Sequence, residues 1–121
     1  MNQQIGEKRM LGTTGIEMTP VAMGCWPITG MTSIDVNPRD SRDTLKAAFE
    51  SGINFFDTAY CYGIHGESET MIADTLGSVR DSIVIATKCG IHWNRDGERV
   101  QDGSAARLSK EIEESLGRLK T

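Results

Sequence analysis

The sequence predicts an α/β fold, in which an N-terminal hairpin precedes three units of one β-strand and one α-helix. Three observations lead to this prediction. Short runs of branched apolar residues recur along the chain, a polar or glycine-rich loop follows each run, and apolar residues at helical intervals follow each loop. Strands that alternate with helices at this spacing form a parallel sheet through right-handed crossovers.

The hairpin is expected within the first 20 residues. Residues 9–11 and 16–18 flank the tetrapeptide G-T-T-G at 12–15, which is typical of turns that join antiparallel strands. The first parallel strand is then expected over residues 21–24, followed by a long loop over residues 25–38.

The helix of the first unit should begin after that loop. Asp40 or Ser41 is expected to be its N-cap, and Gly52 should follow its end. Its apolar face is expected to consist of Leu45, Ala48 and Phe49.

The second unit is expected to have its strand over residues 53–57. Ser68 is the expected N-cap of its helix, which should end near Gly77. Met71, Ile72 and Leu76 are expected on the buried face of that helix.

The third strand is expected over residues 82–88, which are almost continuously apolar, as in a strand buried on both faces. A polar loop over 94–103 should lead to a helix that begins at Ser104. The buried stripe of that helix is expected to consist of Leu108, Ile112, Leu116 and Leu119.

Two architectures contain such units: an open, doubly wound sheet and a closed barrel. No G-x-G-x-x-G pattern follows the first strand, where a dinucleotide-binding open sheet would carry it. This absence favours the barrel.

Composition narrows the class of protein. The net charge is −4 and the basic residues are scattered among acids, so a nucleic-acid-binding surface is not expected. No apolar stretch approaches the length of a membrane span or of a secretory signal. The three cysteines form no disulfide framework, and reduced thiols in a soluble cytoplasmic protein are therefore expected.

Candidate functional residues follow the predicted strands directly. Ligand sites of parallel α/β folds lie at the carboxyl ends of the strands, where Asp57, Tyr62 and Lys88 stand. Asp57 and Lys88 can pair if their strands are neighbours. An ammonium near a phenol makes the phenol a better general acid, which suits protonation of a developing alkoxide.

Several segments resemble the aldo-keto reductase family. Residues 52–63, G-I-N-F-F-D-T-A-Y-C-Y-G, closely resemble its signature G-x-N-x-x-D-T-A-x-x-Y-G. Residues 85–88 look like the third strand of that family with its catalytic lysine, and residues 67–69 resemble the S-E pair that opens its second helix. Residues 113–121 are similar to the E-x-S-L-x-R-L that precedes its fourth strand.

The resemblance implies a (β/α)8 TIM barrel that reduces aldehydes or ketones with NADPH and without a metal. Tyr62 would be the proton donor, with Asp57 and Lys88 tuning it. Gly24 and Trp26, together with Asp57, would contact the cofactor.

The resemblance also implies that residues 1–121 are only the N-terminal part of one barrel domain. The fourth strand, with the family's catalytic histidine and most cofactor contacts, would follow Thr121. Such a barrel needs about 250 residues. The expected partners are therefore a carbonyl substrate and the C-terminal remainder of the barrel, without which we expect no activity.

Other interpretations remain open. Cys25, Cys61 and Cys89 follow strand ends with His65 and His92 nearby, but no zinc-binding spacing occurs, and small buried thiols are favoured. A non-catalytic regulatory or binding homologue on the same scaffold is the alternative function, which the intact catalytic residues disfavour. A short-chain dehydrogenase is excluded because Y-x-x-x-K does not occur.

Two local features have a plain structural interpretation. Trp93 and Arg95 are expected in a solvated loop rather than on a substrate pocket. The run over residues 110–114 is expected to be a solvated helix face, with Lys110 and Glu114 paired one turn apart.

Overall fold

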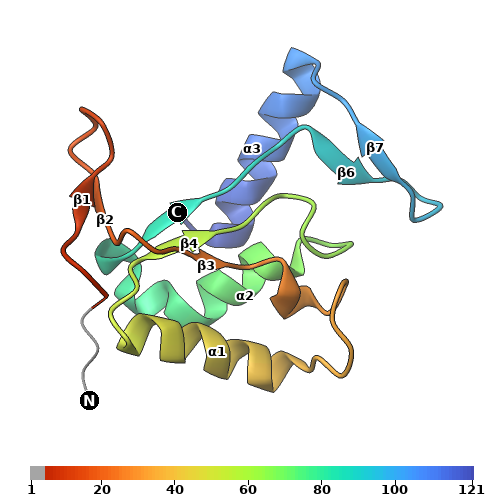
Figure 1. Cartoon of the computed structure of the whole chain (residues 1–121). Coiled ribbons are helices and arrows are strands. Elements are labelled where there is room, and N and C mark those ends of the chain that lie inside the picture. The colour runs from red at the N-terminus through yellow and green to blue at the C-terminus, as the bar shows by residue number, and fades with distance from the viewer. Residues whose placement is uncertain (1–4) are drawn as a thin grey trace.

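A computed structural model describes residues 5–121 (Figure 1). The predicted N-terminal hairpin is present, with β1 (Arg9–Met10) antiparallel to β2 (Glu17–Met18). Asn54 attaches the hairpin to the rest of the chain, because its side chain accepts from Thr19 N at 2.7 Å and donates to Glu17 O at 3.1 Å. Within residues 5–121, none of the helices has the length and apolar character needed to cross a membrane.

The three predicted parallel strands form one sheet in the order β3-β4-β5. They are β3 (Met23–Gly24), β4 (Phe55–Asp57) and β5 (Val84–Ala86), each shorter than the sequence suggests. Gly24 pairs with Asp57, and Asp57 pairs with Ala86. The three strands therefore end at one level of the sheet.

Three α-helices follow the strands in turn: α1 (Pro38–Glu50), α2 (Glu67–Leu76) and α3 (Ala105–Leu119). Helix α2 contacts both α1 and α3 (Figure 1). Two 3-10 turns, η1 (Pro27–Thr29) and η2 (Gly77–Ser82), complete the connections. The alternation of strands and helices after the hairpin is thus confirmed.

Two of the predicted helix starts are wrong. Asn37 caps α1 by accepting from Asp40 N at 3.0 Å, whereas Ser41 is buried and donates to Ile28 O. Gly66, with a positive φ of 73°, precedes α2, and Ser68 lies inside the helix. In both cases the serine hydroxyl is used for a tertiary hydrogen bond. The predicted cap at Ser104 is correct.

The core lies between the sheet and the helices. Phe56 of β4, Leu45 of α1 and Ile72 of α2 are almost completely buried, as the apolar faces of those helices predict. The faces predicted for α1 and α2 are confirmed, with Ala48 and Phe49 partly buried beside them.

The predicted buried stripe of α3 is only partly correct. Leu119 is buried, but Ile112 is 49% exposed and Leu116 is 42% exposed. Glu111 and Ser115 are buried in their place. The reason is that the side of α3 with Glu111 packs against the loop after β5, where Gly90 N donates to the Glu111 carboxylate. Among the described residues, Ile112 and Leu116 are therefore left exposed.

The predicted polar loop over 94–103 is part of a second hairpin, in which β6 (Ile91–Trp93) precedes the loop and β7 (Arg99–Gln101) lies within it. Asn94 closes its turn, since its side-chain oxygen accepts from the backbone N–H groups of Asp96 and Glu98 at 2.9 Å each. The hairpin extends beside α3, away from the parallel sheet (Figure 1).

Candidate active site

The candidate site lies at the carboxyl ends of the three parallel strands. Backbone pairing continues beyond the strands, because Thr58 N donates to Ala86 O at 2.8 Å and Tyr60 N donates to Lys88 O at 2.9 Å. Asp57, at the end of β4, therefore lies beside Lys88, which follows β5. The adjacency predicted from the sequence is present.

Lys88 is held by two acceptors. Its Nζ donates to Asp57 Oδ1 at 2.9 Å and to Thr58 O at 2.7 Å. Partial burial opposes the charged form, but the hydrogen bond and the charge of Asp57, with a contribution from Tyr62, outweigh it and raise the pKa of Lys88. The ammonium is therefore kept charged and oriented, although the side chain is half exposed.

Tyr62 lies between an aromatic ring and this ammonium. The ring centroids of Tyr62 and Trp26 are 4.8 Å apart with the planes at 70°, and Lys88 Nζ is 5.1 Å from the Tyr62 centroid. The backbone around Tyr62 is also fixed, since Tyr62 N donates to Ala59 O and Ser68 N donates to Tyr62 O. This arrangement places a phenol within the field of a positive charge.

A cavity of about 370 Å³ opens beside these residues, a size within the range of small-molecule sites. Its lining combines apolar and aromatic groups with two cations, as follows: Trp26, Ala59, Cys61, Tyr62, Lys88, Cys89, Ile91 and Arg99. Gly24 and Asp57 lie just outside this lining, at the ends of β3 and β4. No heavy atom stands within 4 Å of the position that a Cβ at Gly24 would take, so the surface there is open.

Two buried carboxylates hold the loops of the site, and sequence reasoning missed both roles. Glu69 is completely buried and accepts from Arg118 Nη1 at 3.0 Å and from Thr87 Oγ1 at 2.6 Å. The same Arg118 nitrogen donates to Tyr60 O, and its guanidinium stacks over the Tyr60 ring. This network connects α2, α3 and the loop that carries Tyr62. Glu69 and Arg118 lie in the segments 67–69 and 113–121, which resemble the aldo-keto reductase family. That resemblance is the feature of the sequence that could have pointed to them.

The prediction that residues 110–114 form a solvated face is wrong for Glu111. This side chain is fully buried, and it accepts from Arg107 Nε at 2.7 Å and from Gly90 N. His92 Nδ1 lies 3.3 Å from its carboxylate. The predicted pair one turn apart is present, with Lys110 Nζ 3.8 Å from Glu114 Oε1.

The three cysteines differ in exposure, although Cys61 and Cys89 line the same cavity. Cys25 and Cys61 are buried, as predicted for packing thiols, but Cys89 is exposed because it lines the open cavity. Burial, with the charge of Asp57, raises the pKa of Cys25 to about 12. Among residues 5–121, no group of three or more His, Cys, Asp or Glu side chains is arranged to bind a metal ion.

The expectation of a solvated loop for Trp93 is also wrong. Trp93 lies in β6, is partly buried, and donates from Nε1 to Cys61 O at 2.9 Å. It thereby attaches the second hairpin to the Tyr62 loop. Arg95 is exposed at the turn, and the hairpin residues that line the cavity are Ile91 and Arg99. Sequence reasoning missed Arg99 because the hairpin itself was not predicted.

Comparison with known proteins gives a consistent result. The family model described as "Aldo/keto reductase family" matches residues 20–121. Aldo-keto reductase YhdN of Bacillus subtilis (strain 168) is 32% identical over 117 residues, covering 95% of this chain and 35% of that protein. The NADH-specific methylglyoxal reductase of Escherichia coli (strain K12) is 34% identical over 109 residues, covering 88% and 33%.

A solved structure agrees with these matches. The holo form of aldo-keto reductase AKR11C1 from Bacillus halodurans superimposes with a TM-score of 0.77 at 27% identity, covering 95% of this chain and 37% of that one. The chain thus spans about a third of the length of the curated relatives it matches. Its parallel β–α units correspond to the N-terminal part of the family's TIM barrel. The chain belongs to the aldo/keto reductase family.

Proposed function

We propose that the intact protein reduces aldehydes or ketones to alcohols with NADPH, or catalyses the reverse oxidation. The observation that carries this proposal is the contact set of Tyr62, Lys88 and Asp57 at the mouth of an apolar cavity. Among relatives, one is named as NADH-specific, so the assay compares both cofactors.

Tyr62 is the proposed general acid. When hydride reaches the carbonyl carbon, the carbonyl oxygen becomes an alkoxide, and the Tyr62 hydroxyl donates the proton that completes the alcohol. The positive charge of Lys88 stabilises the phenolate that remains. Asp57 and the Thr58 carbonyl hold that ammonium in place.

The residues present fit a nicotinamide cofactor. Open space above Gly24 and the flat face of the Trp26 ring suit a planar, largely apolar group next to Tyr62. Gly24, Trp26 and Asp57 are the proposed contacts. The cofactor, when bound, supplies the hydride for the carbonyl carbon.

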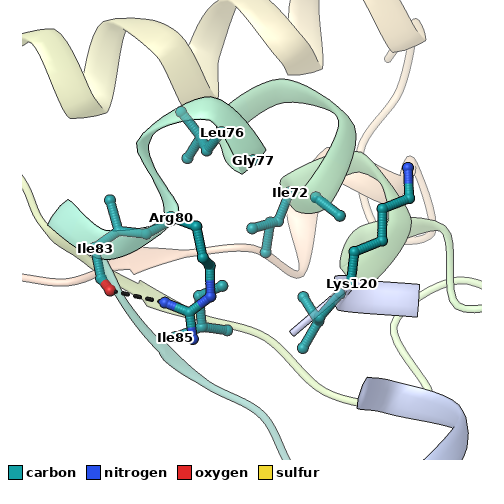
Figure 2. A pocket seen from close by; sticks show the side chains of 9 residues that line it. Ile72, Leu76, Gly77, Arg80, Ile83, Ile85 and Lys120 are labelled. Atoms are coloured by element: carbon teal, nitrogen blue, oxygen red, sulfur yellow. Dashed lines mark hydrogen bonds between the residues drawn. The ribbon is translucent and has the colours of Figure 1, made fainter. Parts of the chain in front are cut away.

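We also propose that residues 1–121 act as the N-terminal part of one barrel domain, completed by a further segment. On α3, Ile112 and Leu116 are exposed next to a second apolar cavity. Figure 2 shows a third pocket, of about 240 Å³, which Ile72 and Ile85 line and beside which Arg80 donates to Ile83 O at 3.0 Å. The exposed apolar side chains of Ile112 and Leu116, rather than the largely buried lining of that pocket, are of the kind that is typical of an interface. Residues 1–121 alone are proposed to be inactive.

The test is a pair of tyrosine variants expressed from the native locus. With NADPH and NADH each supplied in turn, Tyr62→Phe should abolish oxidation of the cofactor with a simple aldehyde, because the proton donor is lost. Tyr60→Phe removes a hydroxyl two residues away that bonds Glu114 instead of facing the cavity, and it should retain activity. Denaturing mass spectrometry of the same sample identifies any second polypeptide.

The proposed reductase and the alternative, a non-catalytic regulatory or binding homologue, give different results in this assay. Carbonyl reduction that depends on Tyr62 supports the reductase, whereas NADPH binding without turnover supports the non-catalytic homologue. We further propose a cytoplasmic location, where the three unpaired thiols would remain reduced.

A further inference from the structure

The second hairpin presents one face to the candidate cavity. Trp93 is paired with Arg99 across the hairpin, and residues opposite each other in an antiparallel pair project on the same side. Ile91, two residues before Trp93, shares that side. The three therefore face the site, where Ile91 and Arg99 line the cavity and Trp93 bonds the Tyr62 loop. His92 projects to the opposite side, toward Glu111 of α3.

Arg99 is a cation without a carboxylate partner. Within residues 5–121 it forms no salt bridge, whereas Lys88, the other cation of the lining, is paired with Asp57. Its charge acts on the cavity wall: burial raises the pKa of Cys61, and the charge of Arg99 opposes that rise. The cavity thus carries one uncompensated positive charge.

We infer that the cavity selects carbonyl compounds that carry an anionic group, and that Arg99 binds this group. The inference rests on the proposed reductase function. A guanidinium presents a planar fork of N–H donors that matches a carboxylate or phosphate. The rest of the lining is apolar or aromatic, apart from the Tyr62–Lys88 pair that faces the carbonyl. A substrate with its carbonyl at Tyr62 and its anionic end at Arg99 satisfies both polar groups of the cavity.

The backbone at Arg99 is fixed relative to the cavity. Hydrogen bonds of β7 to β6 and of Trp93 to Cys61 fix the backbone, so the charge stays on the cavity side. Arg95 provides the matched comparison, because it lies in the turn of the same hairpin and is exposed, as Arg99 is, but does not line the cavity.

The test uses two probes of nearly the same shape, 4-formylbenzoate and its methyl ester, with the intact protein. Turnover gives kcat/KM for each probe with NADPH. Quenching of tryptophan fluorescence, to which Trp26 and Trp93 contribute, gives the dissociation constant of each probe without cofactor. Arg99→Gln should lower the acid-to-ester ratio by about fivefold, the effect of a partly solvated ion pair, while Arg95→Gln should leave it unchanged. Arg99→Lys should restore part of the preference.

The outcomes separate this inference from the proposed function. Equal binding of both probes by the wild type, binding of neither, or equal effects of Arg99→Gln and Arg95→Gln would overturn the inference. So would weaker NADPH binding in Arg99→Gln with an unchanged ratio, since the charge would then serve the cofactor. If Tyr62→Phe keeps full turnover while acid binding still depends on Arg99, the proposed function fails and the anion site stands.

Discussion

Replacement of Glu111 by alanine tests the largest difference between the sequence prediction and the structure. The carboxylate is fully buried and joins three segments: Arg107 one turn earlier in α3, the backbone of Gly90 after β5, and His92 in β6. Removal of this side chain should therefore loosen the attachment of the second hairpin and of the Lys88 loop to α3.

The expected cost is about 3 kcal/mol in the free energy of unfolding. Breaking a buried ion pair by removal of one partner costs about 3–5 kcal/mol. The Arg107 side chain is 20% exposed, so its guanidinium can be hydrated once Glu111 is removed. This favours the lower end of the range of about 3–5 kcal/mol. The N–H of Gly90 also loses its acceptor. Glu111→Gln keeps an acceptor for Gly90 but loses the charge, so about half of that cost is expected.

Urea unfolding followed by far-UV circular dichroism measures these differences. Glu113→Ala is the control, because Glu113 lies on the exposed side of the same helix and should change stability by less than about 0.5 kcal/mol. Equal midpoints for Glu111→Ala and Glu113→Ala would refute the buried-anchor argument. A loss for Glu111→Gln as large as for alanine would show that charge alone matters.

Three further predictions concern thiols, pH and the hairpin. Brief alkylation should modify exposed Cys89 and spare Cys25, whose burial raises its pKa to about 12; peptide mass mapping measures the order. Asp57→Asn should remove less than about 1 kcal/mol, because Lys88 is half exposed. Since the folded pKa of Lys88 is raised, this deficit should persist up to about pH 10.5 and shrink as the pH rises through the folded pKa, as urea titrations at each pH would reveal. Trp93→Phe should cost about 1 kcal/mol and speed hydrogen exchange in β6 and β7.

Each of these predictions has a contrary outcome. Labelling of Cys25 as fast as of Cys89 would mean that the strand end is open to solvent. A deficit in Asp57→Asn that grows above pH 10.5 would contradict the ion pair with Lys88. Unchanged exchange in the hairpin of Trp93→Phe would mean that this indole bond does not hold it.

The sequence determined the order of elements and the identity of the strand-end residues. Alternating apolar runs and loops predict the β–α units, because a strand or helix must bury its apolar side wherever it packs. Glycine and proline mark the turns by local backbone preference. Asp57 and Lys88 could be placed together because parallel strands end at one edge, a consequence of topology that the pattern already contains.

Tertiary structure decided what the local pattern leaves ambiguous. The fate of a polar side chain depends on its partners: Glu111 and Glu69 look like solvated helix residues until Arg107, Arg118 and backbone donors from distant segments surround them. The same holds for Ser68, which would cap a helix in isolation but bonds Thr58 across the core. The second hairpin, with Arg99 on the cavity, is attached to the site because Trp93 donates to a carbonyl on the Tyr62 loop. Apart from the pair of Arg107 and Glu111 within α3, these contacts join different segments of the chain, and local periodicity carries no information about them.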